Sequence, residues 1–212
     1  MELLLQNKLN ADGKLDASGL AVLALHWQND LVLPEGKFGF FAKEIERLGL
    51  VPRMAKVLDA VRAAGGTVIY VNVARSADSR EVIKNRPLFA ASAKVAAFVR
   101  GTHGAAVIEA LKPHPLDFEI DHPRISAFFG NGLDLLLRAR KIQTVVVAGT
   151  ATNVAIDSSV RDALQLGYET ILLEDCCCSS DPSFHEAAMK TLRVLTSWVA
   201  TADEFLARLG SA

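Results

Sequence analysis

The chain has 212 residues, half of them hydrophobic, and a formal net charge of −1 at pH 7. This length and composition predict a single domain over residues 1–212 with a sizeable core, in which residues 1–18 form an N-terminal arm. The near-zero charge argues against a nucleic-acid-binding surface, and without an apolar run of about 18 residues no membrane span is expected. The first residues also lack the basic flank and long apolar region of a signal peptide.

Cysteine usage indicates a reducing compartment. The three cysteines are consecutive: Cys176, Cys177 and Cys178. Consecutive cysteines do not build a disulfide framework, and they lack the spaced pairs of a zinc site. We therefore expect a cytoplasmic protein with no bound metal and no cofactor.

Apolar segments of strand-like composition alternate with helical patterns along the chain. The first, residues 19–25 (GLAVLAL), is typical of a strand buried on both faces. Further strands are predicted at 67–73, 116–120, 144–148, 168–173 and 197–200. Helices are predicted at 51–64, 88–98, 105–111, 133–140, 182–194 and 202–209, and a loop at 31–41. This alternation predicts an α/β fold with three layers, α/β/α, around a mainly parallel sheet whose ligands bind at the carboxyl ends of the strands.

The stretch 141–167 (KIQTVVVAGTATNVAIDSSVRDALQLG) organises the rest of the chain. Its strand turns sharply into a helix that Thr152 or Asn153 would cap and Gly167 would end. Such a turn aims the positive end of a helix dipole at the mouth of the sheet, where an α/β enzyme keeps a nucleophile. The residue at that position is Ala155, which carries no reactive group.

A polar segment, residues 74–87, follows the second predicted strand. It contains Arg75, Arg80 and Arg86. These arginines either place cations near an anionic ligand or belong to a solvated loop, the more common situation for this residue type.

Several motifs carry a family likeness from about Gly19 to the C-terminus. They are LALHWQND, GTHGAAVIEALKP, RISAFFGNGLDLLL, VVVAGTATNVAIDSSVRDALQLGY and the Glu-Asp pair after the next strand. With these motifs the chain resembles the isochorismatase-like hydrolases, which include nicotinamidases and N-carbamoylsarcosine amidohydrolases. The resemblance implies a hydrolase fold, a small-molecule substrate, a homo-oligomer (dimer or tetramer) and a cis peptide bond between Thr150 and Ala151.

All three catalytic positions of that family depart from the family pattern. The family's aspartate falls at His26, its lysine at His122 and its cysteine nucleophile at Ala155. A thiol at a helix N-terminus attacks as a thiolate, and a carboxylate takes its proton, so Ala155 removes the nucleophile. The resemblance and the strand ends further assign substrate-binding roles to Asn29, Phe128, Thr150, Ala151, Asn153 and Cys178.

Each substituted residue has two interpretations. His26 is either a general acid or base or a hydrogen-bonded histidine at a strand end, and His122 is either a substrate contact or a loop histidine. Two histidines without close ligand spacing make a weak metal site. Asp30 is the nearest carboxylate able to replace the family acid, although a structural role is the usual one. The three cysteines offer either a relocated nucleophile or buried structural thiols.

Three functional hypotheses follow from the sequence. The first is a family member that has lost cysteine-hydrolase chemistry and binds a small ligand. The second is an active hydrolase of a small C–N or vinyl-ether substrate that uses His26 and water. The third is a structural or interaction protein whose pocket is filled.

Overall fold

The computed structural model describes residues 12–211, which form a six-stranded sheet with helices on both faces. The strands are β1 (Leu20–Leu25), β2 (Thr67–Val73), β3 (Phe118–His122), β4 (Thr144–Thr150), β5 (Glu169–Cys178) and β6 (Trp198–Ala200). The helices are α1 (Asn29–Val32), α2 (Ala42–Arg47), α3 (Leu50–Ala63), α4 (Pro87–Lys94), α5 (Leu133–Ala139), α6 (Asp157–Gln165), α7 (Pro182–Leu195) and α8 (Ala202–Arg208).

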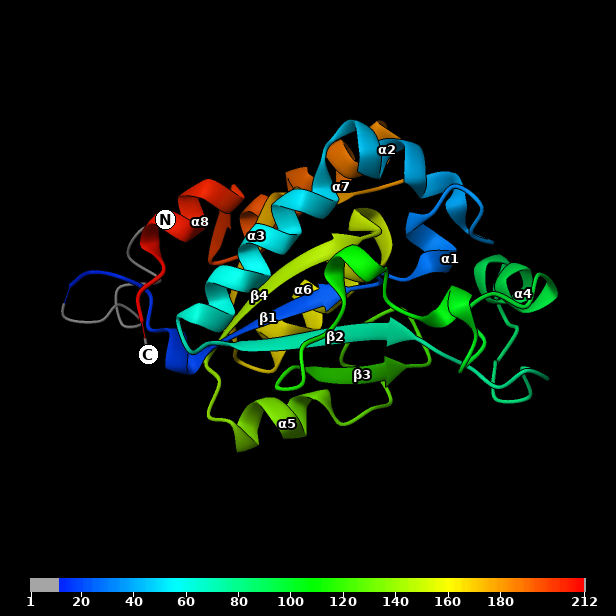
Figure 1. Cartoon of the computed structure of the whole chain (residues 1–212), viewed down its shortest axis with the longest axis horizontal. Coiled ribbons are helices and arrows are strands. Elements are labelled where there is room, and N and C mark those ends of the chain that lie inside the picture. Colours follow the sequence, from blue (N-terminus) through cyan, green and yellow to red (C-terminus); the bar gives the residue numbers. More distant parts are fainter. Residues whose placement is uncertain (1–11, 212) are drawn as a thin grey trace.

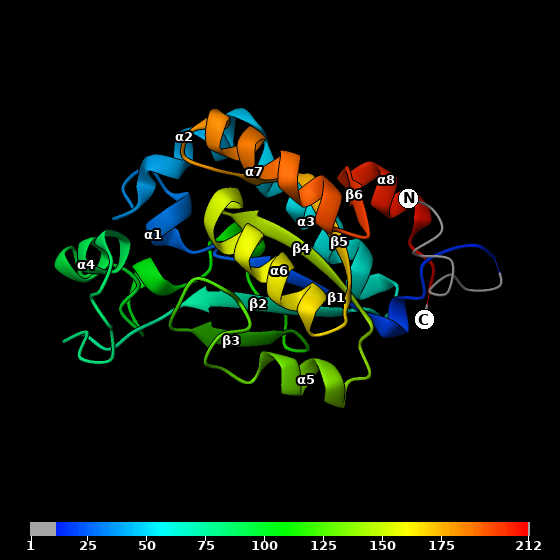
Figure 2. The same ribbon diagram turned by 180° about the vertical axis from the view of Figure 1, so that it is seen from behind.

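All neighbouring strands are parallel, in the order β3-β2-β1-β4-β5-β6. Helices α3 and α8 cover the face of the sheet seen in Figure 1, and α5, α6 and α7 cover the face seen in Figure 2. The predicted three-layer α/β/α fold is therefore confirmed. The strand arrows all run toward the end of the molecule that carries α1 and α4, so the segments after the strands gather there (Figure 1).

The two central strands are buried along their whole length. Every residue of β1 and of β4 is buried, as expected for parallel strands covered on both faces. Their register pairs Leu20 with Thr144 and Leu25 with Gly149. The carboxyl ends of β1 and β4 therefore lie side by side, which places the residues after Leu25 next to the turn after β4.

Some predicted boundaries were wrong where local patterns were weak. The third strand lies at 118–122 instead of 116–120, because its pairing with β2 sets its position. Residues 105–111 are not a helix: a 3-10 turn, His103–Ala105, ends at the first of them, and a second 3-10 turn, Glu109–Leu111, contains the last three. The predicted loop 31–41 includes the end of α1 and a 3-10 turn, and the helix predicted at 88–98 ends at Lys94.

The arm predicted at 1–18 lies partly outside the described residues, which begin at Asp12. Within the described part, the N–H of Leu15 donates to the carbonyl of Arg208 (2.8 Å), and the N–H of Gly210 donates to the carbonyl of Leu15 (3.0 Å). The two ends of the described chain are thus held together, at the amino end of the sheet.

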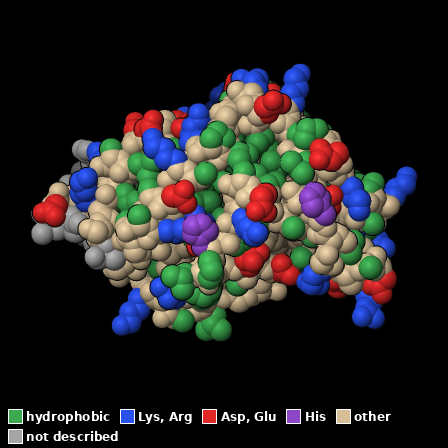
Figure 3. Space-filling view, in the orientation of Figure 1, with side chains coloured by type: hydrophobic (Ala, Val, Ile, Leu, Met, Phe, Trp, Pro, Cys, Tyr) green, Lys and Arg blue, Asp and Glu red, His purple; other side chains and the backbone are tan. Residues whose placement is uncertain are grey.

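The surface carries both signs of charge. On the face in Figure 3, Lys and Arg side chains alternate with Asp and Glu, and apolar side chains reach the surface between them. None of the helices within residues 12–211 is both long and apolar enough to cross a membrane.

Candidate functional site

The turn after β4 brings the backbone of the central motif against the end of β1. Gly149 has a φ of 133°, and a Cβ built on it would lie 2.1 Å from the carbonyl oxygen of Leu25. Only glycine permits this approach, because any side chain would collide with the neighbouring backbone. The following peptide bond, Thr150–Ala151, is cis, as the resemblance implied.

The helix after this turn begins without the predicted side-chain cap. A π-helical turn, Thr152–Ile156, leads into α6, and neither Thr152 nor Asn153 caps it. The hydroxyl of Thr152 instead lies 2.9 Å from Nδ1 of His185, and Oδ1 of Asn153 accepts a hydrogen bond from Ser179 (2.8 Å). Both side chains thus tie the turn to the start of α7 and to the connection before it, a tertiary arrangement that no local pattern signals.

His26 and His122 meet at the carboxyl ends of their strands. The N–H of His26 donates to the carbonyl of Val71 (3.0 Å), and His122 pairs with Val73 in the sheet register. The Nε2 atoms of the two rings are 2.6 Å apart and the ring planes differ by 4°. His26 has a φ of 60°, a left-handed conformation that is uncommon outside glycine and is found at functional sites.

Burial keeps both imidazoles neutral near pH 7. It lowers the pKa of His26 well below its ordinary value, and the proximity of His122 lowers it further. Burial also lowers the pKa of His122 to about 4. An Nε2 to Nε2 hydrogen bond needs one N–H and one lone pair, so the neutral pair holds a single proton between the rings.

A cavity of about 280 Å³ opens from the histidine pair to the surface. Its buried end contains four of the predicted positions, His26, His122, Ala151 and Ala155. Asn153 lines it too. The structure therefore brings together all three substituted catalytic positions and two of the six predicted binding residues.

Phenylalanines form much of the cavity wall and its mouth. Phe38, Phe89 and Phe98 are buried, whereas Phe40 and Phe184 are more than half exposed. Sequence reasoning missed these residues because two of them lie in a predicted loop and three in predicted helices, and no local pattern shows that the loop and the helices meet at one cavity. The available signal was a cluster of aromatic residues inside a predicted loop.

Four predicted binding residues lie away from this cavity. The side chain of Asn29 donates to the carbonyl of His103 (2.7 Å), and the ring of Phe128 packs on Tyr168 with centroids 6.0 Å apart. Two others are also absent from the lining: Thr150, whose buried hydroxyl has no partner among the described residues, and Cys178.

The three cysteines are buried and none lines the cavity. Burial raises the pKa of Cys176 and of Cys178 to about 12, and that of Cys177 well above its ordinary value. These thiols are therefore protonated near neutral pH, and residues 12–211 offer no thiolate to the site.

Asp30 has the structural role that was expected as the usual one. Its carboxylate accepts from the N–H of Phe98 (2.7 Å) and of Lys37 (3.3 Å). Gly104 packs so closely that a Cβ there would lie 2.4 Å from Asp30 Oδ1. Asp30 thus holds together loops beside the cavity and does not replace the family acid within it.

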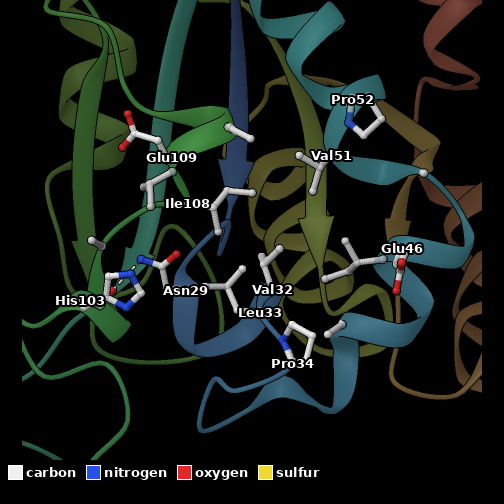
Figure 4. A pocket seen from close by; sticks show the side chains of 16 residues that line it. Asn29, Val32, Leu33, Pro34, Glu46, Val51, Pro52, His103, Ile108 and Glu109 are labelled. Carbon is white, nitrogen blue, oxygen red and sulfur yellow. Dashed lines mark hydrogen bonds between the residues drawn. The ribbon is translucent and has the colours of Figure 1, made fainter.

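A second hollow, of about 830 Å³, lies between α1, the start of α3 and the segment 103–110. Figure 4 shows Val32, Ile108 and Val51 around it, with Glu46 and Glu109 toward its edges. This groove is larger than the histidine cavity but lacks the convergent titratable groups of a catalytic site.

No metal centre is formed within residues 12–211. No group of three or more His, Cys, Asp or Glu in this part of the chain is arranged to hold an ion. The imidazole nitrogens of His26 and His122 that face each other are at hydrogen-bond distance instead.

Comparison with known proteins identifies the family. A model of the isochorismatase domain matches residues 20–204, so the chain belongs to the isochorismatase family. A ureidoacrylate amidohydrolase, RutB, from Rhizobium rhizogenes is 33% identical over 181 residues, which cover 77% of this chain and 72% of that protein. RutB from Agrobacterium fabrum is 31% identical over 209 residues, 90% of each chain.

Solved structures show the same fold. A cysteine hydrolase from Pseudomonas syringae pv. phaseolicola superposes with a TM-score of 0.80 at 27% identity, covering 91% of this chain and 92% of that one. An isochorismatase family protein from Desulfovibrio vulgaris superposes with a TM-score of 0.78 at 30% identity, covering 90% and 99%.

Proposed function

We propose that this member of the isochorismatase family binds a small organic ligand in the cavity at His26 and His122 and does not hydrolyse substrates through a cysteine. The observation that carries the proposal is the methyl group of Ala155 at the buried end of the cavity, where the family pattern has a thiol. The described cysteines give no substitute, because burial keeps their thiols protonated away from this cavity.

The cavity has the features of a binding site for a small molecule. It is at the small end of the roughly 300–1,000 Å³ that ligand pockets span, and apolar side chains surround a few polar groups. The imidazoles of His26 and His122 are polar groups at its buried end. A ligand that fills the cavity would lie against this imidazole pair.

Hydrolysis assays test the absence of cysteine chemistry. The purified protein is incubated with amides and ureas that include nicotinamide and ureidoacrylate, the compound named for the RutB relatives. We expect turnover far below about 1 per second, the lower end of ordinary enzyme rates. Turnover at or above that rate which iodoacetamide abolishes would refute the proposal.

Binding assays test the ligand site. A library of small acids, amides and alcohols is screened by thermal shift, and each hit is measured by calorimetry with the wild type and His26→Gln. We expect His26→Gln to weaken binding, and His114→Gln, at an exposed histidine outside the cavity, to leave it unchanged. Hits that bind both variants equally would place the ligand elsewhere.

The histidine pair favours a second candidate, a hydrolase that activates water. In this mechanism a neutral imidazole takes a proton from water as its oxygen attacks a substrate carbonyl carbon, and the pair returns a proton to the departing nitrogen. A lowered pKa leaves little imidazolium near pH 7, so a base role on a C–N bond is better supported than protonation of a vinyl ether.

The pH profile distinguishes this candidate. A water-activating imidazole predicts a rate that is flat near neutrality and falls as the pH approaches the lowered pKa values, about 4 for His122. Activity that survives His26→Ala, or that rises in acid, would exclude this mechanism.

The remaining expectations from the sequence are also proposals. An open cavity argues against the interpretation of a filled pocket. A homo-oligomer and a cytoplasmic location are proposed from the family resemblance and the cysteine usage. Light scattering on the purified protein and fractionation of the source cells would test them.

A further inference from the structure

Arg124 places a guanidinium group at the wall of the cavity. It lies two residues after His122, and its Cζ is 4.0 Å from the centroid of the Phe89 ring. Its N–H groups donate to two neutral acceptors over long distances, the carbonyl of Ile83 (3.3 Å) and Oδ1 of Asn85 (3.4 Å). Within residues 12–211 no carboxylate forms an ion pair with it.

The other two charged groups that line the cavity are already satisfied. The carboxylate of Glu81 accepts from the N–H and the hydroxyl of Ser76, and these bonds lower its pKa to about 2. The guanidinium of Arg75 is buried and donates to Ser79 (2.8 Å) and to the carbonyls of Ala97 and Ser92. Arg75 thus braces the loops, and Arg124 is the cation of this wall that retains donors for a ligand.

An anionic group would complete this arrangement. A guanidinium presents a planar fork of N–H donors that matches a carboxylate in a bidentate pair. The contact of Arg124 with the ring of Phe89 restricts the guanidinium group, so less conformational entropy is lost on binding. A phosphate monoester carries more charge than one guanidinium neutralises, and the described lining adds one other cation, which is already engaged.

We infer that the ligand is a small carboxylic acid with an aromatic or branched apolar body, whose carboxylate pairs with Arg124. The inference rests on the proposed function and names the ligand class of the same site. The phenylalanine walls would hold the apolar body. The far end would lie toward the histidine pair, which lines the buried end of the same cavity.

Matched pairs of compounds test this inference. Benzoate, phenylacetate and cinnamate are compared by calorimetry with benzyl alcohol, 2-phenylethanol and cinnamyl alcohol, which share the body but lack the charge. We expect at least one acid to bind about ten- to hundredfold more tightly than its alcohol, the range of a charge-assisted hydrogen bond. Phenyl phosphate is included, and a preference for it over all the acids would overturn the choice of a carboxylate.

Variants of Arg124 locate the contact. Arg124→Gln should remove the preference for the acid and leave the alcohol unchanged within about twofold, whereas Arg124→Lys should keep part of it, because the charge remains without the fork. Arg80→Gln is the matched control, since Arg80 is exposed, pairs with Asp78 and does not line the cavity. Circular dichroism and thermal unfolding verify that each variant is folded.

The outcomes separate this inference from the proposed function. An unchanged preference in folded Arg124→Gln, or equal binding of acids and alcohols, overturns the role of Arg124. If no acid binds while another compound from the wider screen binds in a His26-dependent way, the ligand class is wrong and the proposed function stands. If no compound binds in a His26-dependent way, both fail.

Discussion

Nε2 of His26 and Nε2 of His122 lie 2.6 Å apart although the residues are 96 positions apart in the chain. The proposal from the family resemblance is that these positions correspond to an aspartate and a lysine, which is a pair of opposite charges. This chain has a buried pair of neutral imidazoles instead, and protonation of both rings would place two like charges in contact. Under the proposed function this pair lies beside Ala155 in the same cavity, where no thiol needs to be deprotonated.

The histidine pair should make stability fall in mild acid. The pKa of His122 is lowered to about 4, whereas an unfolded histidine titrates near 6.5, so between these values the unfolded chain binds more protons. The free energy of unfolding should therefore be fully present above about pH 6.5. It should decrease by up to about 3 kcal/mol as the pH falls toward 4.

Urea unfolding from pH 4.5 to 7.5 measures this dependence. His122→Gln, which keeps a hydrogen-bonding group but does not titrate, should make the profile less steep, and the slope that remains comes in part from buried His26. The control His114→Gln, at an exposed position, should leave the slope as in the wild type. A wild-type profile that is flat or that rises in acid would contradict the assignment.

The native protein should resist thiol reagents. All three cysteines are buried, and the pKa values of Cys176 and Cys178 are raised to about 12. Ellman's reagent should titrate the three thiols only after denaturation. Ala155→Cys should add one thiol that reacts in the folded state, because Ala155 lines the open cavity. Rapid labelling of a cysteine in the native wild type would support the other interpretation, in which one of the three cysteines is a relocated nucleophile.

Substitution of Gly149 should damage the fold at the site. In Gly149→Ala the new Cβ would meet the Leu25 carbonyl oxygen at 2.1 Å, and φ is 133°. We expect a loss of at least about 2 kcal/mol of unfolding free energy from the forced backbone shift. In Gly19→Ala the Cβ meets nothing within 4 Å, so this control should change stability little. If the two substitutions changed the free energy of unfolding in urea equally, the close contact between residue 149 and the Leu25 carbonyl would not be destabilising, and the prediction would be wrong.

Gln28 should contribute more to stability than a surface glutamine. Its side-chain amide donates to the carbonyls of Val73 (2.8 Å) and Ala105 (2.7 Å), and its oxygen accepts from the N–H of Val73 (2.9 Å). Gln28→Leu leaves these buried groups unpaired and should cost about 3 kcal/mol. Gln165→Leu removes one exposed bond of 3.3 Å to Arg161 and should cost less than about 0.5 kcal/mol. A similar loss for both variants in chemical denaturation would rule out this role of Gln28.

Local patterns in the sequence predicted the layers and the strands. The run GLAVLAL and the segment 144–148 are continuous apolar stretches, and such stretches form central parallel strands whatever their neighbours. The family motifs added the turn after β4 and the positions of its substituted residues. Predicted strand boundaries were wrong where pairing with a neighbouring strand sets them. The example is β3, which pairs with β2 up to its last residue, His122.

The candidate site also has features that the sequence motifs indicate and features that depend on tertiary packing. From the motifs alone, His26, His122 and Ala155 could be proposed as site positions, because residue identity within a motif is a local property. The contacts between the two imidazoles, between Asn29 and the carbonyl of His103, and between Arg124 and the ring of Phe89 became visible in the folded chain alone. Sheet register and the packing of loops set those contacts, and both depend on residues far apart in the chain, which no short-range pattern encodes.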